Sequence, residues 1–103
     1  MAFEIVLAPE AARVLRKLSD HERALVRDTI DRHLGHEPTK VSKSRIKRLR
    51  GLSQPQYRLR VGDIRVFYDV TETAVEILAI VEKHEAQAWL DEQGTPATGG
   101  GTG

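Results

Sequence analysis

Three arginines stand close together in the segment QYRLRVGDIRVFYDV, which runs from position 56 to position 70. Arg58, Arg60 and Arg65 fall within eight residues, on either side of a Gly-Asp pair. An arginine guanidinium can hold a phosphate through two parallel hydrogen bonds and keeps its charge at physiological pH. The spacing therefore indicates an anion site, and a solvated, charged sheet face is the alternative.

The alternation of apolar and polar residues in this segment predicts a β-hairpin. Gly62 and Asp63 suit a two-residue type II′ turn, which has glycine at its first central position. Around that turn Arg60 pairs with Arg65 and Arg58 pairs with Phe67, so these four side chains share one face. The residues of the other face are apolar and belong to the core: Tyr57, Leu59, Val61, Ile64, Val66 and Tyr68.

The arginine face needs a complementary charge, because like charges directly opposed on two strands destabilise the pair. Asp69 is the nearest acidic residue that could neutralise the cluster. Otherwise an external anion is the complement, and an exposed Phe67 would offer a surface on which a base can stack. The pattern favours an RNA site, with a Phe67 covered by the C-terminal segment as the alternative.

Basic residues are concentrated in one part of the chain. Positions 40 to 65 hold nine lysines and arginines and one acid, a net +8, whereas the remainder holds seven basic and fourteen acidic residues, a net −7. This asymmetry favours a polyanionic partner, nucleic acid first. The charged fraction of 30% and the apolar fraction of 40% are typical of a soluble globular domain.

Other classes of site receive no support from the sequence. Cysteine is absent, which excludes disulfides and cysteine-based metal or nucleophile sites. His21, His33 and His36 have no companions at metal-ligand spacing, so we expect them on the surface. The N-terminus lacks a signal-peptide pattern, and no stretch approaches the roughly 20 apolar residues that span a bilayer. We therefore expect a cytoplasmic protein without membrane contact.

The segments before the hairpin predict one strand and two helices. Residues 3–7 alternate as a short strand, and Pro9 fits the first turn of a helix. Ser19 and Glu22 form a capping box for a second helix, and Gly35 fits the position just past its end. Residues 45–52 could form either a strand or irregular structure.

The segments after the hairpin complete an α+β fold. Residues 74–82 are apolar almost throughout, as in a strand that is central or covered on both faces. Residues 84–93 predict a short helix, and the Gly/Thr-rich residues 94–103 a disordered tail. The expected architecture is β-α-α-β-β-β-α in a single domain over residues 1–93, with a helical hairpin packed on one face of an antiparallel sheet.

The stretch KRLRGLSQPQYRLRVGDIRVFYDV, followed by an apolar strand and VEKHEAQAWL, resembles the RelE/ParE toxin superfamily. The shared pattern is L-x-G, a short gap, and Y-[RK]-[LI]-[RK]-x-G-x-x-R-[VL]-x-Y, and the resemblance extends to Gln93. Its RelE branch implies the toxin of a toxin–antitoxin pair, a metal-independent endoribonuclease without a small-molecule cofactor. Such a toxin enters the A site of the 70S ribosome, cleaves mRNA by attack of a 2′-hydroxyl on the adjacent phosphate, and is held by a cognate antitoxin. A ParE-like inhibitor of DNA gyrase and a non-enzymatic RNA- or ribosome-binding module are the alternatives.

The resemblance implies a set of site residues at matching positions, and this chain differs from the family prototype at two points. The residues with implied catalytic roles are Arg58, Arg60, Arg65 and Lys83. The family prototype has lysines where this chain has Arg58 and Arg60, and arginine cannot readily act as a base. Trp89 replaces a tyrosine and cannot exchange a proton, although it can stack on a base.

Substitutes for the missing proton-transfer groups lie at the end of the last long strand. His84, beside Lys83, is the first candidate for the general base because histidine is the usual residue for proton transfer at neutral pH, and Glu82 and Glu85 follow. The residues assigned to contacts with RNA are Lys47, Arg48, Arg50, Phe67 and Trp89.

Overall fold

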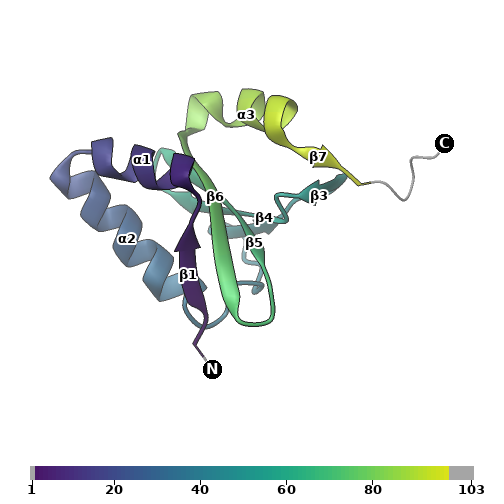
Figure 1. The fold of residues 1–103 in the computed structure, drawn as a ribbon, viewed down its shortest axis with the longest axis horizontal. Helices are drawn as coiled ribbons and strands as arrows, with labels where there is room; N and C mark the ends of the chain where they lie inside the picture. Colours follow the sequence, from purple (N-terminus) through teal and green to yellow (C-terminus); the bar gives the residue numbers. More distant parts are fainter. Residues whose placement is uncertain (1, 98–103) are drawn as a thin grey trace.

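A five-stranded sheet forms the centre of the fold, which the computed structural model describes for residues 2–97 (Figure 1). The elements in chain order are β1 (Glu4–Leu7), α1 (Pro9–Lys17), α2 (Asp20–Leu34), β2 (Ile46–Arg48), β3 (Leu52–Gln54), β4 (Tyr57–Val61), β5 (Ile64–Val70), β6 (Ala74–Glu82), the 3₁₀ helix η1 (Lys83–Glu85), α3 (Ala86–Gln93) and β7 (Thr95–Pro96). The spatial order of the sheet is β1-β6-β5-β4-β2. The expected α+β class is therefore confirmed.

The hairpin and its neighbours pair as the sequence predicted, with one difference at the edge. Arg60 lies opposite Arg65 and Arg58 opposite Phe67, as the two-residue turn requires. β6 is a central strand between β1 and β5. β1, however, joins β6 in parallel, so the sheet is mixed, not antiparallel throughout. A parallel pairing needs a long crossover, and the α1–α2 hairpin and the strands after it supply that connection.

The two long helices begin where local chemistry directs them. Pro9 opens α1 in its first turn. Ser19 caps α2, and its Oγ accepts a hydrogen bond from the Glu22 backbone N–H at 3.1 Å. Gly35 is the C-cap of α2. These signals are all local, which is why the sequence predicted both helices.

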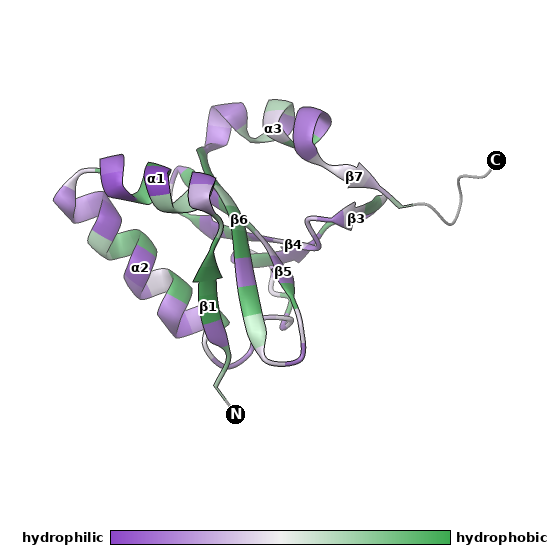
Figure 2. Ribbon diagram, in the orientation of Figure 1, coloured by the Kyte–Doolittle hydropathy of each residue, from purple (hydrophilic) through white to green (hydrophobic). Residues whose placement is uncertain are grey.

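The core lies between the α1–α2 hairpin and one face of the sheet. Figure 2 shows apolar colour along β1 and β6, while α1 and α2 alternate between polar and apolar residues. The main buried side chains are Ala11, Leu15, Val26, Ile30 and Leu34 from the helices and Leu59, Val61, Val66, Tyr68, Val75, Ile77 and Ile80 from the strands. The opposite face of the sheet is left to the C-terminal segment, which crosses it as η1 and α3 (Figure 1).

The C-terminal segment is more ordered than the sequence suggested. β7 pairs with β3, and Leu52 lies opposite Pro96. The expectation of a disordered tail from position 94 is therefore wrong for residues 94–97, because backbone hydrogen bonds hold them against residues 51–54. Ala97 N, for example, donates to Gly51 O at 3.0 Å. Residues 98–103, the rest of the expected tail, lie outside the described part of the chain.

Candidate functional site

The basic residues of β2, β4 and β5 meet on the sheet face that does not pack against α1 and α2. Lys47 lies opposite Arg58 in the β2–β4 ladder, and Arg60 lies opposite Arg65 in the β4–β5 ladder. Phe67 completes this face beside Arg58. Because side chains alternate along a strand, the β4–β5 register places Arg58, Arg60, Arg65 and Phe67 on this face, and the β2–β4 register adds Lys47.

The hairpin turn holds two of the basic residues in place. Gly62 has a φ of 58°, a left-handed conformation that favours glycine, and its carbonyl accepts a 2.8 Å hydrogen bond from Arg65 Nη1. A second bond, at 3.2 Å, runs from the same nitrogen to Ile64 O. The carbonyl of Asp63 accepts the backbone N–H of Lys83 at 2.7 Å. Successive turn carbonyls thus orient the Arg65 guanidinium and bring Lys83 beside it.

These side chains line one cavity of about 250 Å³ between the sheet and α3. The residues around it are Lys47, Leu49, Arg58, Arg65, Phe67, Lys83, Ala86, Gln87 and Leu90. Four of the nine are cations and none is acidic, so the cavity is suited to an anion. Of the expected catalytic residues, it brings together Arg58, Arg65 and Lys83.

The guanidinium of Arg58 is partly buried beside two other arginines. Burial lowers its pKa, and the nearby charges of Arg65 and Arg60 lower the pKa further. Its Nε is buried and has no hydrogen-bond partner among the described residues. A polar atom in this state costs about 1–3 kcal/mol, and a bound anion would reduce the repulsion among the arginines.

Asp69 does not neutralise the arginines, contrary to one sequence-based expectation. Its Oδ2 accepts a bond from Gln54 Nε2 at 2.6 Å, and its Oδ1 accepts the backbone N–H of Gln56 at 2.8 Å. The carboxylate therefore fixes the chain that leads into β4. The basic cavity keeps its full positive charge.

Phe67 is buried, and the expectation that it is exposed for base stacking is wrong. Its side chain is 1% exposed, and the Trp89 ring stacks on it with centroids 5.0 Å apart and planes 5° from parallel. This arrangement is the alternative in which the C-terminal segment covers Phe67. Trp89 is thereby engaged on the protein itself, and α3 forms one wall of the cavity instead of leaving an open aromatic platform.

Comparisons with known proteins find their matches among solved structures alone. No protein-family model and no curated protein matches the chain. A RelE–RelB complex from Pyrococcus horikoshii is 24% identical, with a TM-score of 0.66, over 81% of this chain and 97% of that chain. The toxin–antitoxin complex RelBE2 from Mycobacterium tuberculosis is 26% identical, with a TM-score of 0.62, over 80% and 99%. A mutant of the Escherichia coli toxin RelE in the free state is 18% identical, with a TM-score of 0.65, over 86% and 92%.

The chain has a RelE-like fold.

The RelE-like chain extends its basic cavity into a neighbouring groove. A second hollow of about 430 Å³ shares Lys47, Leu49, Gln87 and Leu90 with the first. Its remaining lining residues are Arg48, Arg50, Leu52 and Asp91. The expected RNA contacts Lys47, Arg48 and Arg50 are therefore adjacent to the arginine cavity. The Arg48 guanidinium also lies over the Tyr57 ring, 5.0 Å from its centroid.

Two of the expected catalytic residues of the RelE-like chain lie apart from the cavity. Arg60 is exposed and does not line it, although it shares the sheet face with Arg65. His84 is also exposed, with Nδ1 3.5 Å from Glu82 Oε1 and Nε2 3.9 Å from Glu85 Oε2. The structure thus groups His84 with its acidic neighbours and leaves the cavity lined by lysine and arginine.

Several residues that shape the cavity were not predicted from the sequence. Leu49, Ala86, Gln87 and Leu90 form its less polar wall. Ala86, Gln87 and Leu90 follow helical spacing, which could have marked one face of α3. That face could not be assigned to the sheet without knowing that the chain crosses back over Phe67.

Two kinds of feature are absent from residues 2–97. No helix in that range is long and apolar enough to cross a membrane. The same range holds no group of three His, Asp or Glu residues arranged to bind a metal ion.

Proposed function

We propose that this protein is the toxin of a toxin–antitoxin pair and acts as a ribosome-dependent mRNA endonuclease. The observation that carries the proposal is the cavity in which Lys47, Arg58, Arg65 and Lys83 converge without an acidic residue. The RelE-like fold supports the same function, since its structural neighbours include toxins in complex with RelB. A phosphate of mRNA bound in the ribosomal A site is the anion that the cavity would receive.

The proposed reaction is an internal phosphoryl transfer. The ribose 2′-oxygen forms a bond to the adjacent phosphorus, and the bond from phosphorus to the 5′-oxygen breaks. The products are a 2′,3′-cyclic phosphate and a free 5′-hydroxyl end. Arg58 and Arg65 can stabilise the negative charge that grows on the phosphate oxygens. Arg65 is held by a turn carbonyl before the reaction begins, and Arg58 offers a buried Nε donor that has no partner among the described residues.

Two proton transfers accompany this reaction, and the chain offers few groups for them. The 2′-hydroxyl must lose a proton, and the leaving 5′-oxygen must gain one. Lys47 and Lys83 are the cavity-lining residues able to exchange protons, since arginine stays charged. His84, oriented by Glu82, becomes the base if the RNA passes over the end of β6. Arg60, at the rim of the same face, would draw the RNA backbone towards the cavity.

A cognate antitoxin is the proposed protein partner. Structural neighbours of this chain are complexes of RelE with RelB, and an acidic antitoxin segment would complement the basic residues between positions 40 and 65. Such a segment would compete with RNA for the cavity. This competition would explain how the antitoxin silences the toxin.

One observation favours a non-enzymatic RNA-binding module as the second candidate. The cavity holds no histidine or carboxylate, and Trp89 occupies the position of the tyrosine that the family prototype carries. A protein built this way could bind the ribosome or RNA without cutting it. Measuring DNA supercoiling after induction distinguishes the endonuclease and the RNA-binding module from a ParE-like gyrase inhibitor, because only the gyrase inhibitor should change supercoiling.

Mapping mRNA ends on programmed ribosomes with purified protein is the decisive experiment. We expect new 5′-hydroxyl ends within the A-site codon, and we expect Arg65→Ala to abolish them because the transition-state charge loses its oriented donor. Lys43→Ala is the matched control, because Lys43 is an exposed cation of the same basic segment that does not line the cavity. Ribosome binding without new ends would support the non-enzymatic module instead. Equal cleavage by Arg65→Ala and Lys43→Ala would remove the arginine cavity from the mechanism.

A further inference from the structure

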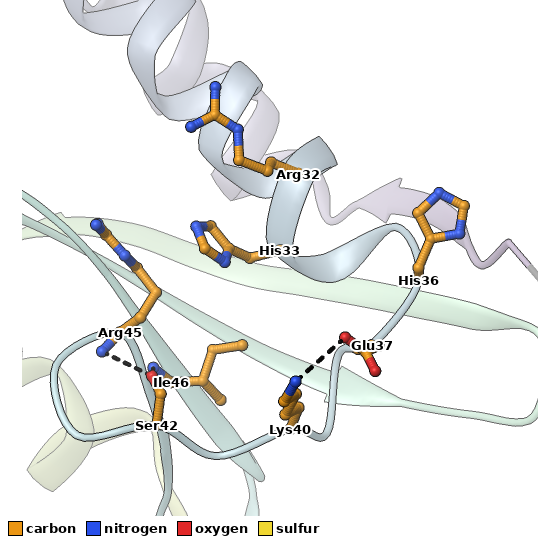
Figure 3. Close-up of a pocket in the computed structure, with 8 residues that line it drawn as sticks. All are labelled: Arg32, His33, His36, Glu37, Lys40, Ser42, Arg45 and Ile46. Atoms are coloured by element: carbon orange, nitrogen blue, oxygen red, sulfur yellow. Dashed lines mark hydrogen bonds and ion pairs between the residues drawn. The ribbon is translucent and has the colours of Figure 1, made fainter.

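Another basic pocket, apart from the arginine cavity and the groove beside it, lies where the end of α2 meets the loop that leads to β2 (Figure 3). Its volume is about 230 Å³, several times the roughly 30 Å³ of a liquid water molecule. The lining residues are Arg32, His33, His36, Glu37, Lys40, Ser42, Arg45 and Ile46. None of them lines the arginine cavity under α3, so the two hollows are separate.

The lining of this pocket is positively charged. It contains three permanent cations and one carboxylate, which leaves a net +2 before either histidine is protonated. Glu37 lies 3.7 Å from Lys40, and Arg32 pairs with Asp28 outside the pocket at 2.7 Å. Among the described residues, Arg45 has no carboxylate partner within ion-pair distance. Its charge is therefore available to a ligand.

The end of α2 accounts for only part of this positive charge. Basic residues in a last helical turn complement the negative end of the helix dipole, which is equivalent to about half an elementary charge. Arg32 and His33 occupy that last turn. Lys40 and Arg45 lie beyond the helix and still contribute two cations.

Hydrogen-bond donors are oriented for a ligand in this pocket. Arg45 Nη1 donates to Arg60 O at 3.0 Å, which anchors one branch of the guanidinium and leaves its other N–H groups free. Ser42 Oγ accepts the backbone N–H groups of Arg45 and Ile46, both at 3.1 Å. The hydroxyl proton of Ser42 can then be donated outward. Figure 3 shows the Arg45 guanidinium and the His33 ring next to each other at the left of the view, with His36 and Glu37 at the right.

His33 lines this pocket at the surface, where it is more enclosed than an ordinary surface histidine. It is half-buried, and burial lowers its pKa, with further lowering by the charges of Arg45 and then Arg32. The other charged or titratable groups that line the pocket are His36, Glu37 and Lys40. An anion among these groups would offset the repulsion that His33 experiences on protonation.

We propose that this pocket is a second phosphate-binding site. It binds a different backbone phosphate of the RNA from the one that enters the arginine cavity. RNA is favoured as the source because Arg45 and Lys47 lie two residues apart at the edge strand β2, roughly 7 Å along the chain. One single strand can therefore contact both hollows. Binding at this pocket does not depend on the cleavage chemistry proposed above.

The test is an NMR pH titration of the His33 imidazole in the full chain, without ligand, with inorganic phosphate, and with a short single-stranded RNA. We expect both ligands to raise the pKa of His33. Arg45→Gln should weaken phosphate binding about tenfold, the usual effect of losing one charge-assisted hydrogen bond. Arg16→Gln is the matched control, because it removes an exposed cation that does not line the pocket.

Each outcome of the titration has one meaning. A His33 response to both ligands that Arg45→Gln weakens and Arg16→Gln leaves unchanged supports the proposal. A response to inorganic phosphate alone keeps the phosphate chemistry but overturns RNA as its source. No response to either ligand, or equal losses in Arg45→Gln and Arg16→Gln, overturns the phosphate site, whether or not the protein cleaves mRNA.

Discussion

At Arg58 the proposed function and the stability of the fold make opposite demands on one residue. Its Nε is buried without a partner, and the charges of Arg65 and Arg60 lower its pKa. A methionine side chain is also long and unbranched, so it could occupy much of the same space without the charge and the unsatisfied donor. We expect Arg58→Met to raise the free energy of unfolding by about 1 kcal/mol, measured by urea denaturation, and to abolish mRNA cleavage.

Arg60→Met is the control for this prediction. Arg60 belongs to the same sheet face but is exposed, so its replacement should change stability by no more than about 0.5 kcal/mol. A loss of stability in Arg58→Met, with Arg60→Met unchanged, would show that Arg58 makes a favourable contact in the free protein.

At the residue scale, the sequence predicted which residues pair across the strands more accurately than it predicted which side chains are exposed. The pairing of Arg58 with Phe67 and of Arg60 with Arg65 follows from the turn alone, and the structure confirms it. Alternation also predicts which residues share a face, but it cannot say what lies over that face. Trp89 covers Phe67 from a helix 22 positions later, and no local pattern in the hairpin contains that information.

The β4–β5 turn is the element that assembles the arginine cavity. Gly62 has a φ of 58°, and a side chain there is strained even though a Cβ would meet no atom within 4 Å. We expect Gly62→Ala to cost about 1–2 kcal/mol of unfolding free energy and to reduce cleavage more than Asp63→Ala does. Asp63→Ala keeps the backbone carbonyl that receives Lys83 N–H, so it isolates the turn conformation. Equal cleavage by the two variants would contradict this role of the turn.

The loop between α2 and β2 is fastened to the sheet through Tyr68. The hydroxyl of this buried side chain donates to Pro38 O at 2.7 Å, and burial, followed by the proximity of Tyr57, raises its pKa well above the usual value near 10. Because the folded pKa is raised, the stabilisation is complete below about pH 10 and is lost as the pH rises further.

Tyr68→Phe tests this connection between loop and sheet. We expect it to lower the free energy of unfolding at neutral pH by about 1 kcal/mol, because Pro38 O loses its donor. It should also flatten the decline in stability above pH 10, measured by urea denaturation across that range. An alkaline decline of unchanged size would assign that decline to other groups.

At the element scale, local signals and long-range pairings differ in how well they could be predicted. The capping box at Ser19 and the position of Pro9 place both long helices without reference to any tertiary contact. The β3–β7 pairing could not be predicted from the sequence. β7 has only two residues and therefore shows no periodicity, and it reaches β3 only because α3 crosses back over the sheet. The parallel entry of β1 beside β6 likewise depends on the global arrangement of the chain.

At the scale of the whole molecule, charge is segregated between the chain's segments. Residues 40–65 carry +8 and the remainder −7. The +8 segment supplies β2, β4 and the start of β5, which form one edge of the sheet and its hairpin. The two basic hollows at this edge, one under α3 and one beside α2, would steer a polyanion towards it before any specific contact forms.

This charge distribution predicts a steep dependence of RNA affinity on salt. A single strand releases about 0.7 counterion per phosphate neutralised, so one phosphate in the arginine cavity and one in the pocket beside α2 should give a slope of at least about −1.4 in a plot of log K against log salt concentration. Arg65→Gln should reduce that slope by about 0.7, measured by fluorescence anisotropy with a short single-stranded RNA. Lys43→Gln, outside both hollows, should leave it unchanged. If Arg65→Gln weakens binding equally at every salt concentration, Arg65 contacts the RNA through something other than a phosphate, and the proposal that the arginine cavity binds a phosphate is wrong.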